Sequence, residues 1–233
     1  SSFSRSFASP PASFGTAIAD TFVAAMDTLF DQQIDDNGAI YMIPDGLTTG
    51  CIYVRADWIK EKLGIEYTDL LDEWCWDRYI QLVYELTDPD QGRYGISFRG
   101  GFGGVDRVSE YMQAMRENTG VMWTGLETGD PDQVDYLYDT EEDAELMKKY
   151  VSMYWDGCAP ADSINWGFTE MVDGFCGGLT GTLLNDMEVV ASILASDLTE
   201  DQWGVLPIPA IAPQGKIFQG VNGNSYTYGI SNQ

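Results

Sequence analysis

The closing segment, residues 203–231, constrains the fold of this chain most: WGVLPIPAIAPQGKIFQGVNGNSYTYGIS. Pro207 and Pro209 disfavour a helix and also disfavour pairing inside a central strand. Gly220 and Gly223 permit left-handed backbone and a close approach of backbone to another group. The alternating Tyr and Ile residues that follow are typical of a strand. The segment therefore predicts an extended crossing, a short turn and a closing strand.

Strand and helix patterns alternate along the rest of the chain. The clearest helix is predicted for residues 76–87, where apolar residues recur every three or four positions. Further helices are predicted at residues 16–33, 105–118, 140–156 and 168–175, and short strands at residues 39–44, 51–54, 94–98 and 178–184. Strands separated by helices predict the α/β class.

Local signals refine several of these elements. Thr140 is expected to be the N-cap of the helix at 140–156, and Asp57 to cap a helix that ends at Gly64. Three tryptophans fit helical stripes and are expected in the core: Trp74, Trp76 and Trp155.

Charge and the absence of histidine exclude several function classes. Twelve Lys and Arg stand against 37 Asp and Glu, which gives a net charge of −25. Such a field repels nucleic acid and anionic membranes, and suits a solvated acidic surface, a cationic partner or a salty environment. Without histidine there is no His-based acid–base catalysis or His-ligated metal site. Hydrolysis by paired carboxylates remains available, because it needs no histidine.

The four cysteines do not have the spacing of a zinc site, and the sequence leaves both buried free thiols and disulfides open. The stretch beginning at Asp88 is similar to a calcium loop, but its sixth position is Arg93 and its twelfth is Arg99, which excludes that reading. We therefore expect no metal and no cofactor. No apolar run is long enough to span a membrane, and no signal peptide is visible. Ser1 is not a natural start, which indicates a processed or cropped N-terminus.

Four pieces of the chain, in this order, resemble one family. They are AIYMIPDGLTTGCIYVRADWIKEKLG, WDRYIQLVYELTDPDQGRYGISFRGG, FTEMVDGFCGGLTGTLLNDMEVVASI and the closing segment. Together they resemble the bacterial and archaeal extracellular solute-binding proteins of family 1, the maltose-binding-protein-like receptors of sugar ABC transporters. The first and last pieces resemble the two chain crossings between the family's lobes. The resemblance covers roughly residues 38–231.

The resemblance implies an α/β fold of the type II periplasmic-binding-protein kind: one lobe with a mixed sheet flanked by helices and two hinge-crossing strands, the first lobe being largely missing. The implied division has three parts. Residues 1–46 are a remnant of the first lobe with the first crossing, residues 47–219 are the second lobe, and residues 220–233 are the return hinge strand.

Candidate ligand-binding residues lie in loops at strand ends, where amide, carboxylate, guanidinium and ring groups suit a polyhydroxylated ligand. Arg99 and Gly100 open the loop RGGFGG, in which glycines let a ligand approach the backbone; the alternative for Arg99 is a structural ion pair. Asp45 lies in the first crossing loop and is alternatively a solvated turn residue. Trp123 and Trp166 stack on a sugar ring or serve as core or hinge anchors.

The remaining candidates lie further along the chain. Asn185 stands where a strand meets a helix, and the neighbouring Asp186 is alternatively a plain N-cap. Gly223, Asn224 and Tyr226 belong to the return crossing, where glycine is alternatively needed for hinge mobility. No residue is assigned a catalytic role.

The resemblance implies a non-enzymatic function: capture of a carbohydrate or polyol between two lobes for import by an ABC transporter. The implied partners are the small ligand and the permease subunits, and the implied protein is an extracellular or periplasmic monomer anchored as a lipoprotein. Two alternatives remain. One is a carboxylate-dependent glycoside hydrolase or lyase, suggested by the many acids and aromatics. The other is a surface interaction protein that uses its acidic face.

Overall fold

A computed structural model of the protein describes residues 42–44, 49–104, 123–125, 128–136, 140–213 and 227–229, together with Val108, Ser109, Met112 and Met115. The chain divides into two compact units, residues 1–47 with 224–233, and residues 48–223. Within the first unit, strand β1 (Met42–Pro44) pairs antiparallel with strand β8 (Thr227–Gly229), so that Ile43 lies opposite Tyr228. The strand predicted near the start and the closing strand are therefore neighbours in one small sheet.

The second unit is built on a four-stranded mixed sheet with the order β3–β6–β2–β7. Its strands are β2 (Gly50–Arg55), β3 (Tyr94–Ile96), β6 (Thr180–Asp186) and β7 (Trp203–Pro207). Strand β3 runs parallel to β6, whereas β2 is antiparallel to both of its neighbours. The carboxyl ends of β3, β6 and β7 consequently lie at the same end of the sheet as the amino end of β2.

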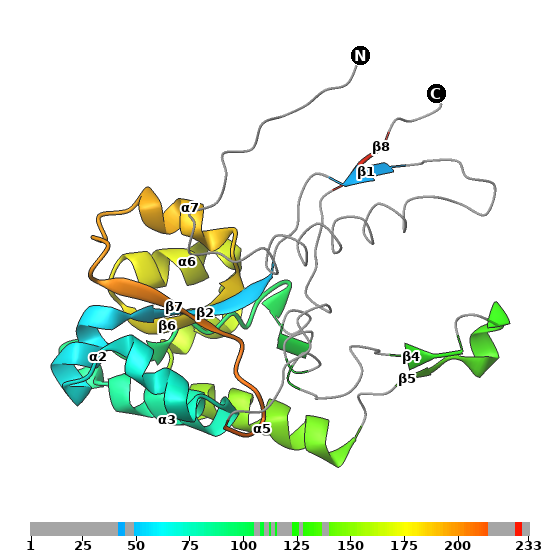
Figure 1. The fold of residues 1–233 in the computed structure, drawn as a ribbon, viewed down its shortest axis with the longest axis horizontal. Coiled ribbons are helices and arrows are strands. Elements are labelled where there is room, and N and C mark those ends of the chain that lie inside the picture. The colour runs from blue at the N-terminus through cyan, green and yellow to red at the C-terminus, as the bar shows by residue number, and fades with distance from the viewer. Residues whose placement is uncertain are drawn as a thin grey trace. The chain divides into compact units, whose positions relative to one another are not determined.

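Helices cover both faces of this sheet (Figure 1). One face packs against α2 (Ala56–Leu63), α3 (Trp76–Leu86) and α5 (Glu141–Trp155), and the other against α6 (Phe168–Cys176) and α7 (Val189–Leu194). Strand β2 shows the alternation that this requires, since Ile52 and Val54 point to the first core, and Cys51 and Tyr53 to the second. The α/β class, with a mixed sheet flanked by helices, is confirmed.

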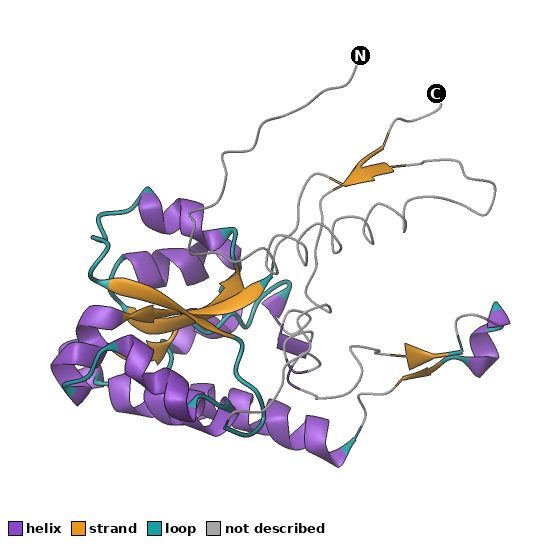
Figure 2. Cartoon of the chain, viewed as in Figure 1, coloured by secondary structure: helices purple, strands orange, loops and turns teal. Residues whose placement is uncertain are grey.

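Shorter elements also occur along the chain (Figure 2). Short 3-10 helices are η1 (Tyr67–Glu73), η2 (Pro89–Gln91), η4 (Pro131–Gln133) and η5 (Ala161–Asn165). A hairpin is formed by β4 (Trp123–Thr124) and β5 (Asp135–Tyr136). In the region predicted as a helix at 105–118, Val108, Met112 and Met115 are helical and buried, as expected.

Of the three helix ends predicted from the sequence, at Thr140, Gly64 and Asp57, the first two are confirmed. The Thr140 hydroxyl accepts the Asp143 backbone N–H at 3.2 Å, and the Asp143 carboxylate accepts the Thr140 backbone N–H at 3.3 Å, which closes a capping box. Helix α2 ends at Gly64, whose φ of 71° is left-handed. The prediction for Asp57 was wrong, because α2 starts at Ala56 and Asp57 lies in its first turn, where it pairs with Arg55.

Two further expectations about burial need correction. Trp155 was expected in the core, but its side chain is 74% exposed. The buried face of α5 contains Tyr150 and Met153, and Trp155 lies two residues beyond Met153, about 200° around the helix axis. Asp186 is not a helix N-cap, since it is the last residue of β6 and is fully buried.

The surplus of carboxylates predicts a stability that depends on salt. At a net charge of −25 the folded chain repels itself, and added salt screens this repulsion as the Debye length falls to about 3 Å at 1 M. We expect the melting temperature to rise by roughly 5 °C between low salt and 1 M NaCl, measured by differential scanning calorimetry. A melting temperature that stays constant or falls would mean that the surface ion pairs outweigh the repulsion.

Candidate functional site

Three of the candidate residues lie at the end of the sheet where β3, β6 and β7 have their carboxyl ends, which we call the carboxyl end of the sheet. Arg99 and Gly100 follow β3, and Asn185 lies at the end of the neighbouring β6. Ligands of open α/β sheets bind outside the carboxyl ends of the strands. The first candidate site is therefore this end of the sheet.

The loop after β3 is held by the segment that contains η5. The backbone N–H of Gly100 donates to the Ser163 carbonyl at 3.0 Å, and that of Gly101 donates to the Trp166 carbonyl at 2.9 Å. A Cβ at Gly100 would lie 2.5 Å from the Ile164 Cα. The close approach expected at these glycines thus involves the protein's own backbone, which requires glycine there for packing.

The side chain of Arg99 packs against the backbone of its own loop. Gly103, with a φ of 76°, passes so close that a Cβ there would lie 2.6 Å from the Arg99 Nη2, and the guanidinium carbon lies 6.0 Å from the centre of the Phe168 ring. The Arg99 Nε is buried and has no hydrogen-bond partner. The glycines therefore hold a partly buried cation at the end of β3.

Arg99 also differs from the other cations of the described chain. Eight Lys and Arg residues are described there, and seven form an ion pair with a carboxylate: Arg55, Lys60, Lys62, Arg78, Arg93, Lys148 and Lys149. Within this described part, no carboxylate lies within 4.0 Å of Arg99. The structural ion pair considered for Arg99 is thus not formed by these residues.

Phe102 is a site candidate that sequence reasoning missed. It stands at the tip of the same loop, and 93% of its side chain is exposed, the largest fraction among the exposed large apolar residues of the described chain. The signal that could have identified it is an aromatic residue with two glycines on each side, which no helix or strand stripe can bury. An exposed ring at this end of the sheet is suited to the apolar face of a sugar.

The side chains of Trp166 and Asn185 are buried at the carboxyl end of the sheet. Trp166 is only 8% exposed, and a Cβ at Gly174 would lie 2.9 Å from the Trp166 Cζ3, so the indole packs on α6. Asn185 is 1% exposed, and its Oδ1 accepts the backbone N–H of Asp186 at 2.8 Å. These contacts support the loop, and direct ligand contact by either side chain stays a prediction.

The other candidates are not brought to this end by described residues. The backbone of Trp123 lies in β4, opposite Tyr136, in the hairpin that precedes α5. Asp45, Gly223, Asn224 and Tyr226 lie outside the described residues. Their proposed contact with ligand stays a prediction.

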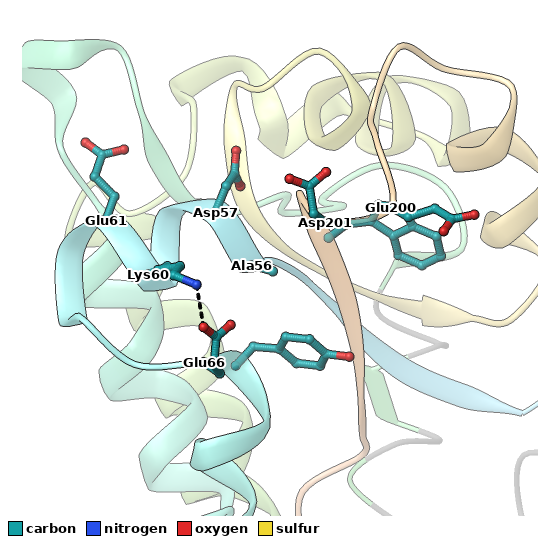
Figure 3. Close-up of a pocket in the computed structure, with 9 residues that line it drawn as sticks. Ala56, Asp57, Lys60, Glu61, Glu66, Glu200 and Asp201 are labelled. Carbon is teal, nitrogen blue, oxygen red and sulfur yellow. Dashed lines mark hydrogen bonds and ion pairs between the residues drawn. The ribbon is translucent and has the colours of Figure 1, made fainter.

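A pocket of about 460 Å³ lies at the opposite end of the sheet (Figure 3). Its lining is Ala56, Asp57, Lys60, Glu61, Glu66, Tyr67, Glu200, Asp201 and Trp203. Much of its charge is already paired, since Lys60 donates to Glu66 across the pocket, Arg55 holds Asp57 and Arg93 holds Glu61. These ion pairs join α2 to the turns around it, and we assign the pocket a structural role.

All four cysteines are free, which resolves the alternative that the sequence left open. Cys51, Cys75 and Cys158 are buried, while Cys176 is partly exposed. Burial raises the pKa of Cys51 to about 11, and burial also raises the pKa of Cys158 and Cys176. Because only the thiolate reacts, these thiols are held in their unreactive form at neutral pH.

We therefore expect slow thiol labelling in the native protein. At pH 8 an aromatic disulfide reagent should react within minutes with at most one thiol, Cys176, and with four thiols after unfolding in denaturant. Since the folded-state pKa of Cys51 lies above its usual value of 9.0, its contribution to stability is complete below pH 9 and is lost as the pH rises through 11. Rapid native labelling of two or more thiols would contradict this burial.

Two negative findings apply to the described chain. Among those residues, no helix combines the length and the apolar run needed to cross a bilayer. Within the same ranges, no group of three or more Cys, Asp or Glu residues is placed to hold a metal ion.

No protein-family model matches the sequence, and neither does any curated protein. Solved structures do match. An ABC transporter solute-binding protein from Agrobacterium vitis with bound D-mannitol has a TM-score of 0.61 at 21% identity, over 79% of this chain and 42% of that one. One from Agrobacterium radiobacter in complex with ribitol has a TM-score of 0.61 at 15% identity, over 85% and 48%. The maltose-bound MalE3 of T. maritima has a TM-score of 0.58 at 18% identity, over 92% and 50%.

This chain shares their fold. At these identities the likeness concerns the fold alone, and the fold is that of the type II periplasmic-binding proteins expected from the sequence. The chain spans less than half the length of the two Agrobacterium proteins. These matched structures are solute-binding proteins.

Proposed function

We propose that this chain is part of the extracellular substrate-binding component of an ABC transporter, and that it captures a carbohydrate or polyol for import. Residues 47–219 would be its second lobe. The neighbours of the same fold bind D-mannitol, ribitol and maltose, which supports this ligand class. The permease, the monomeric state and a lipid anchor of the receptor belong to the same proposal.

The observation that carries the proposal is the loop Arg99–Gly104 at the carboxyl end of β3. The same short loop carries an exposed ring, Phe102, and a cation, Arg99, that has no carboxylate partner among the described residues. Sugar recognition needs both kinds of group, since a ring covers the C–H face of a sugar and a guanidinium makes paired hydrogen bonds to neighbouring oxygens. Trp166 and Gly100 fix the loop through the contacts described above.

The test is isothermal calorimetry of the purified protein against hexoses, pentoses, alditols and short oligosaccharides, followed by chromatography of each mixture. We expect saturable binding of at least one of these compounds with the compound recovered unchanged. Release of shorter sugars from an oligosaccharide would favour the carboxylate-dependent enzyme instead. Absence of binding across the whole panel would overturn the proposal and favour an interaction protein.

A further inference from the structure

The charge environment of Arg99 bears on the class of ligand. The chain carries 37 acidic residues, and each of the other seven described cations has one of these carboxylates as its partner. A chain with this surplus of acidic residues can place a carboxylate beside almost any of its Lys and Arg side chains. Arg99 differs, because no carboxylate of the described residues pairs with its partly buried guanidinium, and a buried charge without a partner costs stability.

A second polar group near this loop also lacks a partner. Ser163 is fully buried, and its Oγ has no hydrogen-bond partner, although its carbonyl accepts the backbone N–H of Gly100. The Nε of Arg99, one residue away from Gly100, is likewise buried and unpartnered. Buried polar groups are normally satisfied. Two unsatisfied polar groups therefore lie on the two segments that are hydrogen-bonded to each other at this end of the sheet.

We propose that the ligand is an anionic sugar, whose single carboxylate or phosphate pairs with Arg99 while its ring lies on Phe102. This inference rests on the proposed function and narrows its substrate class. A planar carboxylate matches the fork of a guanidinium, and charged hydrogen bonds of this kind are about twice as strong as neutral ones. The net charge of the protein opposes an anion only weakly, because the field is screened beyond about 8 Å at physiological salt.

The two glycines that follow Phe102 hold the Arg99 side chain in place. Gly103 and Gly104 fold against the Arg99 side chain and carbonyl so closely that any larger residue would displace them. The Phe168 ring lies at cation–π distance from the guanidinium. Neither neighbour provides a negative charge, and within the described part of the chain no carboxylate neutralises the guanidinium.

The experiment compares the Kd of D-glucuronate, D-galacturonate and D-glucose 6-phosphate with that of D-glucose and D-galactose, by calorimetry at 0.15 M NaCl. We expect at least one anionic sugar to bind tenfold or more tightly than its neutral counterpart. Whether the uronates or the sugar phosphate show the preference separates the two sources of the anionic group. Equal or weaker binding of all three anionic sugars, with a neutral sugar bound, would overturn the inference and leave the proposed function intact.

Variants separate a local role of Arg99 from the overall charge. Arg99→Gln should reduce at least tenfold the preference for the anionic sugar over its neutral counterpart, whereas Arg99→Lys should keep much of that preference. Lys148→Gln is the matched control, because it removes the same charge from an exposed ion pair on α5. Equal losses in Arg99→Gln and Lys148→Gln would contradict the inference. Binding of none of the five sugars would overturn the inference, whereas the proposed function would be overturned only if the hexoses, pentoses, alditols and oligosaccharides of its own panel also failed to bind.

Discussion

Phe102→Ala is expected to weaken sugar binding tenfold or more while leaving the melting temperature within about 1 °C of the parent. The ring is 93% exposed, so its loss removes little packing from the folded state. An aromatic anchor that becomes covered by a ligand contributes about 2 kcal/mol or more to binding, which exceeds one factor of ten in Kd. Calorimetric titration with the best sugar of the panel, together with thermal unfolding, measures both quantities.

The matched control for Phe102 is Trp155→Ala. Trp155 is another strongly exposed aromatic residue, at 74%, and it lies at the end of α5 in contact with Tyr154. Its removal should leave Kd within a factor of two. A second variant, Phe102→Tyr, should retain most of the affinity because it keeps the ring face. Equal losses from Phe102→Ala and Trp155→Ala would contradict a specific role for the loop.

Gly95→Ala is expected to lower the free energy of unfolding by about 3 kcal/mol, or to prevent folding. Gly95 lies in β3, where the strand packs directly on the end of α3. A Cβ there would overlap the Val83 carbonyl, lying 2.6 Å from its carbon, and would lie 2.7 Å from the Thr87 Oγ1. The Thr87 hydroxyl also accepts the Gly95 backbone N–H at 3.1 Å, so the substitution breaks a contact that fixes both elements. Urea unfolding followed by tryptophan fluorescence gives the value.

Gly167→Ala is the control for a glycine with space around it. Among the described residues, the obstacle nearest to a Cβ at Gly167 is the flexible end of Glu170, at 3.2 Å, and the backbone there is not left-handed. The change in unfolding free energy should stay within about 1 kcal/mol. If Gly95→Ala were as mild as Gly167→Ala, strand β3 would not pack on α3 as described.

The layered fold could be predicted from the apolar periodicity of the helices and strands and from the residues that mark their ends. The apolar stripe from Trp76 to Leu86 indicates which face of α3 is buried, and Thr140 and Gly64 mark helix ends through short-range hydrogen bonding and left-handed backbone. Trp155 shows where pattern reasoning fails. Membership of a helix does not place a residue on its buried face, and a shift of two positions turns a side chain to the opposite side.

The site was harder to predict because it depends on contacts between distant segments. Arg99 was identified from its place after a strand, but whether it has a carboxylate partner is decided by which acids the fold brings near it. The glycines beside it appeared to make room for a ligand, whereas the segment of Ser163 and Ile164 fills that room. Asn185, a polar residue at a strand end, turned out to be buried with its amide oxygen bonded to the next residue.

Hydrogen–deuterium exchange, with and without the best sugar of the panel, tests most directly whether the carboxyl end of the sheet is the binding site. Sugar binding is expected to slow amide exchange in the loop at 97–104 and in the segment at 161–166 that holds it. Exchange around the acidic pocket, at 56–67 and 199–203, should not change. Protection confined to the acidic pocket, with no effect at 97–104, would contradict this account.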